Sequence, residues 1–287
     1  MKQGSSRMVS ANGLSLPALG QGAWRIGDRA ERAREEIEAL RLGLDRGLTL
    51  IDTAEMYGEG RSETLIGQAL EGYRREELYL VSKVYPHNAG GSQLFASCDA
   101  SLKRLNTSYL DLYLLHWRGS IPLRETVEGM EELVRAGKIR RWGVSNFDTE
   151  DMEELWSIPG GEHCAANQVL YHLGSRGIEF DLLPWLRAHE VATMAYCPLA
   201  QAGALRRDLL ANRTLTAIAA KHAVSVMQIL LAFVLRQEGV IAIPKAGSPA
   251  HVEENAKAAA LILSAQDWAE IDRAFPPPQR KTPLAMQ

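Results

Sequence analysis

The sequence predicts an α/β protein, a (β/α)8 barrel with an N-terminal β-hairpin and a C-terminal extended tail. Eight strand-like apolar runs recur along the 287 residues, and helical patterns separate most of them. Strand and helix patterns alternating in this way fit either a barrel or an open sheet, and the count of eight favours the barrel. In addition, no Gly-x-Gly-x-x-Gly follows the first long strand, so the usual sign of a doubly wound dinucleotide-binding sheet is missing.

The elements follow one another in a regular order. Residues 8–16 read as a hairpin, because Asn12-Gly13 supplies the two positive-φ positions of a type I′ turn. Helical spacing is clear over residues 28–46, where Arg32/Glu36 and Arg34/Glu38 are expected to pair at i,i+4. The remaining helical patterns cover residues 92–105, 122–136 and 226–237, and the strand-like runs lie near residues 18–23, 48–54, 78–84, 110–116, 141–145, 166–171, 191–197 and 239–244.

Size and composition favour one domain spanning residues 1–287, since barrels of this class often exceed 200 residues. The net charge of −3 argues against a nucleic acid or an anionic membrane as partner, because both require a concentrated basic surface. The longest apolar stretches, such as residues 229–235, are far shorter than the roughly 20 residues of a membrane span. Residues 276–283 contain several prolines and are expected to form an extended arm.

Cysteine usage and the N-terminus indicate a cytoplasmic protein. The three cysteines, Cys98, Cys164 and Cys197, are odd in number and far apart, so a disulfide framework is not expected. Residues 1–7 lack the apolar core of a secretion signal. No Cys-x-x-Cys or His-x-x-x-His spacing predicts a metal site, and we expect a monomer or a weak homo-oligomer.

Four polar residues lie at or just beyond the ends of three consecutive strand-like runs. They are Asp52, Tyr57, Lys83 and His116, and a parallel barrel would bring them to one mouth. Taken singly, each is more simply explained as a helix cap, a solvated loop residue or a barrel residue. Taken together, they predict a catalytic site, with Lys83 lowering the pKa of the Tyr57 phenol from about 10, Asp52 holding Lys83, and His116 pointing a ring N–H at a substrate oxygen.

Several segments resemble the aldo-keto reductases in order and spacing over nearly the whole chain. They are Asp52-Thr-Ala-Glu-Met-Tyr57, Val81-Ser-Lys83, Asp111-Leu-Tyr-Leu-Leu-His116, Trp142-Gly-Val-Ser-Asn-Phe147 and Ile243-Pro-Lys245. The resemblance implies an NADPH-dependent carbonyl reductase. It makes Tyr57 the general acid, Lys83 and Asp52 the pair that tunes it, and His116 the residue that orients the carbonyl.

The same resemblance implies where the cofactor binds. At Ala246 and His251 the chain departs from the hydroxyl residue and the arginine common in the family, so NADPH is expected to be preferred with NADH as a weaker alternative. A helix opening near Pro249, with Lys245 before it, suits a phosphate on physical grounds. The implied cofactor-binding residues are Ser145, Asn146, Gln168, Tyr196, Pro198, Leu199, Gln201, Lys245, Ser248, His251, Glu254 and Asn255.

The substrate pocket is predicted to be lined by aromatic side chains. Trp24, Tyr85 and Trp117 lie near strand ends, whereas Tyr171 fits a pocket and the core equally well. Within the family the chain is most similar to bacterial methylglyoxal reductase-type members. The chain after Phe275 is short, which predicts an open pocket and broad reduction of small aldehydes and α-dicarbonyls such as methylglyoxal.

Two other functions use the same residues. A regulatory or redox-sensing subunit would keep the barrel and the cofactor but turn over slowly. A Schiff-base aldolase or lyase would use a lysine at the barrel mouth as nucleophile, and Lys83 is the candidate. NADPH consumption with small carbonyls separates the reductase from both.

Overall fold

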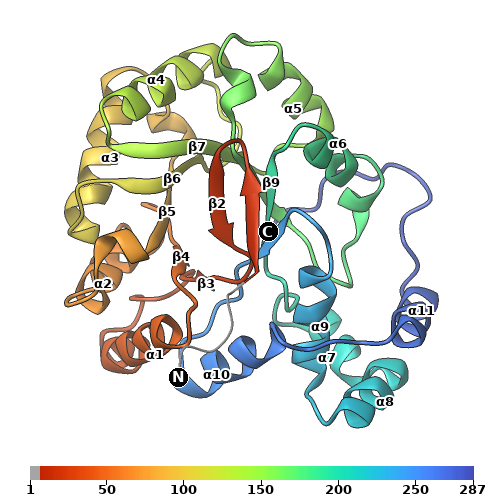
Figure 1. Ribbon diagram of the computed structural model, residues 1–287. Coiled ribbons are helices and arrows are strands. Elements are labelled where there is room, and N and C mark those ends of the chain that lie inside the picture. Colours follow the sequence, from red (N-terminus) through yellow and green to blue (C-terminus); the bar gives the residue numbers. More distant parts are fainter. Residues whose placement is uncertain (1–6) are drawn as a thin grey trace.

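The computed structural model describes residues 7–287 and shows a closed barrel of eight parallel strands (Figure 1). The strands follow chain order around the barrel, from β3 to β10, and each pairs with its neighbour. Parallel bridges between Leu19 and Ala242 and between Gly22 and Lys245 close the ring. The strands are β3 Gln21–Gly22, β4 Leu50–Asp52, β5 Tyr79–Val84, β6 Leu110–Leu115, β7 Ile139–Ser145, β8 Ala166–Leu170, β9 Ala192–Tyr196 and β10 Val240–Ala242.

These strands lie within or beside all eight apolar runs, so the barrel prediction is confirmed. Residues 1–6 lie outside the described residues, and the expectation that they carry no secretion signal stays a prediction. In residues 7–287 no single helix has the length and apolar character to cross a membrane. Only the pair α8 (Arg213–His222) and α9 (Val226–Leu235) meets that criterion jointly, and it is bent by 92° at the break.

The predicted hairpin is present and covers one end of the barrel. Strands β1 (Met8–Ala11) and β2 (Leu14–Pro17) are joined by Asn12 and Gly13 at φ values of 42° and 72°, as a type I′ turn requires. Figure 1 looks onto this end, with the hairpin across the centre of the barrel. Val9 and Leu16 of the hairpin pack with inward side chains of the strands, including Leu112 and Met194. This apolar plug closes the end where the strands begin and leaves the opposite mouth for the site.

The helices lie around the outside of the barrel (Figure 1). In α4 (Leu123–Arg135) the buried positions Leu123, Val127, Met130 and Leu133 recur every three or four residues, which places one apolar face on the barrel. The remaining helices are α1 Ala33–Asp45, α2 Arg61–Ala69, α3 Gly91–Leu105, α5 Thr149–Trp156, α6 Leu182–Ala188, α7 Ala204–Ala211, α10 Pro249–Ala258 and α11 Ala265–Ala274, with short 3-10 turns at Ala30–Arg32, Arg75–Glu77, Pro86–Asn88, Gly161–His163 and Gly177–Glu179.

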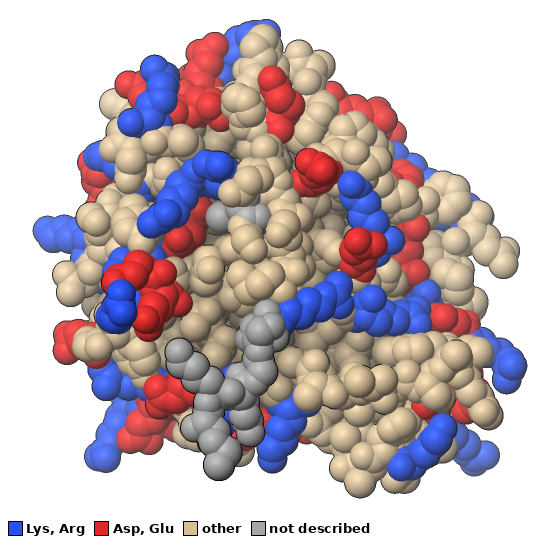
Figure 2. Space-filling model, in the orientation of Figure 1, with Lys and Arg blue, Asp and Glu red and all other residues tan. Residues whose placement is uncertain are grey.

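One of the two ion pairs predicted for the first helix is formed. Arg34 and Glu38 pair at 3.1 Å, whereas Arg32 pairs with Glu35 at 3.2 Å instead of with Glu36. The reason is burial, because Glu36 is 2% exposed and accepts a hydrogen bond from the backbone of Gly27. The barrel end seen in Figure 2 carries acidic and basic side chains intermixed around its rim.

Candidate active site

Asp52 and Lys83 form a buried ion pair inside the open mouth of the barrel. Asp52 ends β4 and Lys83 is the penultimate residue of the neighbouring β5, so the two strand ends place them side by side. The Lys83 Nζ donates to both Asp52 oxygens, at 2.9 and 2.8 Å, and to the backbone oxygen of Thr53 at 2.7 Å. The side chain of Lys83 is 0% exposed and that of Asp52 is 3% exposed. Burial lowers the pKa of Lys83 while Asp52 opposes that shift, so the ammonium is held by its partner.

Tyr57 lies beside this pair, on the loop that follows β4. Its hydroxyl is 3.4 Å from the Lys83 Nζ, and the ammonium lies 4.9 Å from the centre of the tyrosine ring. Burial raises the pKa of Tyr57 well above its ordinary value, and the charge of the Asp52 carboxylate adds to the increase. The predicted lowering of the Tyr57 pKa is therefore wrong, because burial and the Asp52 carboxylate raise it. The phenol is protonated at neutral pH, as a proton donor must be.

His116 completes the predicted group. It directly follows β6, and its ring lies edge-on to the Tyr57 ring with a centroid distance of 5.8 Å. Burial and the Lys83 charge lower the pKa of His116 to about 3, so the imidazole is neutral and carries a single N–H. Its Nδ1 is buried and has no hydrogen-bond partner in residues 7–287. A neutral imidazole beside the phenol is suited to orient a carbonyl oxygen.

A network of hydrogen bonds joins four of the predicted cofactor residues to the catalytic group. The Gln168 Nε2 donates to Asp52 Oδ1 at 2.7 Å, and the Ser145 hydroxyl donates to the Gln168 backbone oxygen at 2.8 Å. The Tyr196 hydroxyl donates to Asn146 Oδ1 at 2.9 Å, and Asn146 holds a positive φ of 60°. These residues lie at the ends of β7 and β9 and in the middle of β8, so adjacent strands position the whole set.

The catalytic group opens into a cavity of about 450 Å³, here named the catalytic cavity. Trp24 and Trp117 line it, as predicted, together with Met56. Tyr85 does not line it. It stacks on His87 and meets the edge of Trp117 at 6.1 Å, so it lies behind the pocket wall. Tyr171 belongs to the core, where it is 0% exposed and donates to Glu179 at 2.7 Å.

A second cavity of about 420 Å³, here named the outer cavity, adjoins the first. Trp24, Cys197, Lys245 and Gln287 line both cavities, which makes one elongated path suited to a long ligand. Ser248 lines neither cavity, and it is the residue before Pro249 at the start of α10. The predicted cofactor residues that line the outer cavity are Pro198, Leu199, Gln201, Lys245, His251, Glu254 and Asn255.

The segment after α11 contributes residues that the sequence did not predict. Residues 276–287, which include the arm predicted for residues 276–283, form no helix or strand and run back to the barrel axis, where the C-terminal label lies in Figure 1. Met286 and Gln287 line the catalytic cavity, and the Cys197 thiol donates to Gln287 Oε1 at 2.9 Å. The mouth is thus partly covered, whereas a short tail had predicted an open pocket.

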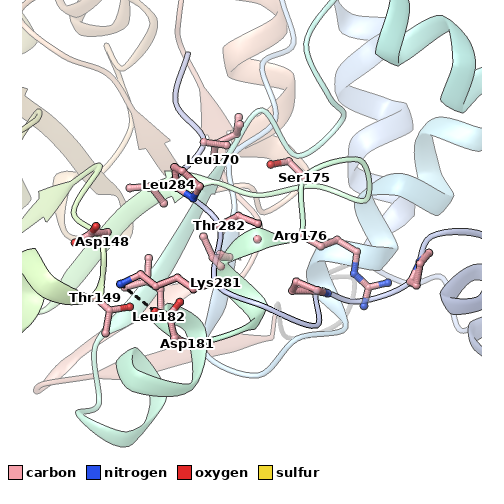
Figure 3. A pocket seen from close by; sticks show the side chains of 16 residues that line it. Asp148, Thr149, Leu170, Ser175, Arg176, Asp181, Leu182, Lys281, Thr282 and Leu284 are labelled. Atoms are coloured by element: carbon pink, nitrogen blue, oxygen red, sulfur yellow. Dashed lines mark hydrogen bonds and ion pairs between the residues drawn. The ribbon is translucent and has the colours of Figure 1, made fainter.

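Contacts on the side of the barrel hold this segment in place (Figure 3). The Lys281 Nζ lies 3.0 Å from Glu150 and 3.5 Å from Asp181, and the Arg176 guanidinium donates to the backbone oxygen of Phe275. Between the segment and the barrel is a third cavity of about 310 Å³, whose lining includes Asp148, Arg176, Asp181 and Thr282. These contacts fix the path that brings Met286 to the mouth.

Comparison with known proteins agrees with this geometry. The model of the Aldo/keto reductase family matches residues 18–275. The chain is 56% identical over 281 residues to methylglyoxal reductase YeaE of Escherichia coli, covering 98% of this chain and 99% of that protein. It is 36% identical over 262 residues to glyoxal reductase of Bacillus subtilis, covering 91% and 90%.

Solved structures agree as well. An aldo/keto reductase from Klebsiella pneumoniae in complex with NADP and acetate superposes with a TM-score of 0.95 at 54% identity, covering 99% of this chain and 100% of that one. The thermostable aldo-keto reductase Tm1743 superposes with a TM-score of 0.85 at 41% identity, covering 93% and 99%. Since the family model spans most of the chain and these relatives cover it nearly end to end, the protein belongs to the aldo/keto reductase family.

Proposed function

We propose that the protein reduces small aldehydes and α-dicarbonyls, methylglyoxal among them, to alcohols with NADPH. The observation that carries the proposal is the contact of Lys83 with both Asp52 and the Tyr57 hydroxyl, beside the neutral His116. The activities of the two relatives, a methylglyoxal reductase and a glyoxal reductase, support the substrate class. The catalytic cavity of about 450 Å³ suits a small carbonyl compound.

The residues present fit a dinucleotide. The catalytic and outer cavities form one elongated path, and the hydrogen-bonding side chains of Ser145, Asn146 and Gln168 lie at its inner end. The outer cavity carries Arg25, Arg206 and Lys245, which suit phosphate groups. When bound, the reduced nicotinamide supplies a hydride. The Klebsiella pneumoniae relatives, solved with NADP and with NADPH, support NADPH as the cofactor.

The side chains of this protein handle the proton. His116 donates its N–H to the carbonyl oxygen and so fixes the carbonyl near Tyr57. As hydride reaches the carbonyl carbon, the Tyr57 hydroxyl gives its proton to the oxygen, and the product is an alcohol. The negative charge left on Tyr57 is stabilised by the Lys83 ammonium, which Asp52 holds at 2.8 Å. Trp24 and Trp117 limit the water that reaches this site.

The contacts of Lys83 disfavour the aldolase alternative. Its Nζ is fully buried and donates hydrogen bonds to both Asp52 oxygens and to the Thr53 backbone oxygen. A Schiff base requires a free amine with access to the substrate. The buried and paired Nζ of Lys83 has no such access.

An absorbance assay at the reduced-nicotinamide band tests the proposal. A panel of small aldehydes, glyoxal and methylglyoxal is combined with NADPH and, separately, with NADH. We expect NADPH to be oxidised with several of these carbonyls and NADH to serve less well. If neither cofactor is oxidised with any carbonyl, the reductase proposal fails; if NADPH binds tightly but turns over slowly with every carbonyl, the redox-sensing alternative is favoured.

A further inference from the structure

The outer cavity has an uneven distribution of charge. Its α10 side presents His251, Glu254 and Asn255, none of which carries a permanent positive charge. Glu254 adds a carboxylate there, and it accepts a hydrogen bond from the Ser225 hydroxyl. The phosphates of a dinucleotide therefore find no fixed cation among the α10 residues that line the outer cavity, because Lys257, in the last turn of α10, does not line it. Lys245, which precedes α10, does line the outer cavity.

Arg206 supplies a permanent cation to the outer cavity from another helix, α7. It lies on α7 (Ala204–Ala211), and it lines the outer cavity but not the catalytic cavity. Among the described residues, its guanidinium makes a polar contact with the sulfur of Met227 alone, at 3.7 Å. A thioether sulfur is a weak acceptor, so the five N–H donors of this side chain are nearly unused.

Neighbouring arginines differ in this respect. Arg32 donates to the Gly247 backbone oxygen at 3.1 Å and pairs with Glu35. Arg46 pairs with Glu253 of α10. Arg25 also lines the outer cavity, but its guanidinium lies 4.5 Å over the Trp24 ring, close to the junction with the catalytic cavity. Arg206 therefore differs from these three arginines. Among the described residues, its guanidinium, at the far end of the path, has neither a carboxylate nor an aromatic partner.

We propose that Arg206 of α7 binds a phosphate group in the adenosine half of the dinucleotide. The inference rests on the proposed function, since it assumes that a dinucleotide occupies the two cavities. Arginine binds phosphate through two parallel N–H donors and keeps its charge at every physiological pH. The phosphate concerned is either the 2′-phosphate, which only NADPH carries, or the pyrophosphate, which NADH shares. In both cases a contact from α7 compensates for the lack of a fixed cation among the α10 residues that line the outer cavity.

The test compares two arginines on the same helix. R206Q removes the proposed contact, and R207Q is the matched control because Arg207 is exposed and lines neither cavity. Dissociation constants for NADPH and NADH are measured by calorimetry on the full chain. We expect R206Q to weaken NADPH binding by about tenfold or more, as for the loss of a charged hydrogen bond, and R207Q to change it by less than about twofold. If R206Q weakens the binding of NADPH alone, the phosphate concerned is the 2′-phosphate. If it weakens the binding of NADH equally, the phosphate concerned is the pyrophosphate.

Salt dependence separates a phosphate contact from damage to the fold. The NADPH dissociation constant of the wild type should rise more steeply with salt than that of R206Q, because one charge contact is lost in the variant. Equal affinity of R206Q and wild type, or an equal salt slope in both, overturns the role of Arg206. If the wild type binds neither dinucleotide, the proposed function itself fails, so the two failures are distinguishable.

Discussion

At the scale of single residues, the site depends on one buried charge and the carboxylate that holds it. Lys83 is fully buried, and the free energy of placing an ammonium there is offset by two hydrogen bonds to Asp52 and one to Thr53. Without the ammonium, the anion left on Tyr57 after proton transfer would have no stabilising charge within hydrogen-bond distance. We therefore expect the pair to serve both the fold and the proposed reaction.

Replacing the carboxylate is expected to affect stability and turnover together. D52N leaves the Lys83 ammonium buried without its counter-charge, so we expect a loss of about 3–5 kcal/mol in the free energy of unfolding and a strongly reduced reductase rate. Urea denaturation measures the first effect. The control is E38Q, which removes the ion pair between Arg34 and Glu38, whose side chains are 92% and 55% exposed. This change should lower the free energy of unfolding by less than about 1 kcal/mol. A D52N protein as stable as E38Q would show that the pair is not needed by the fold.

At the scale of elements, residues 276–287 connect the outside of the barrel with its mouth. Lys281 anchors the segment on Glu150 and Asp181, and Met286 reaches the catalytic cavity. Met286 is 55% exposed, so it contributes little to the core, and its effect is on the shape of the pocket.

Removing Met286 and Gln287 should therefore change substrate binding and leave stability unchanged. We expect the KM for methylglyoxal to rise several-fold, because one wall of the pocket is lost, while the free energy of unfolding changes by less than about 0.5 kcal/mol. Steady-state kinetics and urea denaturation measure the two. I262A is a suitable control, since Ile262 is 86% exposed and lines neither cavity. An unchanged KM in the shortened protein would exclude the segment from the substrate pocket.

The elements were predictable from the sequence where a repeating pattern specified them. All eight strands follow from apolar runs, and the positions of Asp52, Lys83 and His116 at strand ends follow from the barrel, since parallel strands end at one mouth. The path of residues 276–287 was not predictable, because a segment with several prolines has no periodicity and its contacts lie far away in the chain. Tyr85 was misplaced for a related reason: its strand end is at the mouth, but the neighbouring Trp117 takes the position facing the cavity.

The electrostatic properties of the site were harder to predict than its position. The sequence shows that a lysine lies near Tyr57, but the direction of the Tyr57 pKa depends on burial and on the distance to Asp52. Both quantities follow from packing, which the sequence pattern does not give.

At the scale of the whole molecule, two buried histidines link stability to pH. Burial lowers the pKa of His116 to about 3 and that of His172 to about 4, both below the ordinary 6.5. At pH values between these folded-state pKa values and 6.5, the unfolded chain binds more protons than the folded chain. This contribution to stability is therefore complete above pH 6.5 and is lost as the pH falls through that range, by roughly 1.4 kcal/mol per pH unit for each histidine.

The variant H172Q isolates one of these contributions. Urea denaturation of the wild type and of H172Q at pH 7, 6 and 5 should show a shallower loss of stability in the variant, because one proton-linked group is absent. Carboxylates titrate in both proteins and cancel in the comparison. The same pH dependence in both would contradict the neutral, buried state of His172.

The most direct test of the central claim is the behaviour of Y57F with NADPH and methylglyoxal. This substitution removes the hydroxyl that lies 3.4 Å from the Lys83 ammonium and preserves the ring. We expect the turnover rate to fall by roughly a hundredfold or more, in line with the loss of a general acid, while the NADPH dissociation constant stays within about twofold of the wild type. A variant that binds NADPH normally and keeps most of its reductase rate would contradict the assignment of Tyr57 as the proton donor.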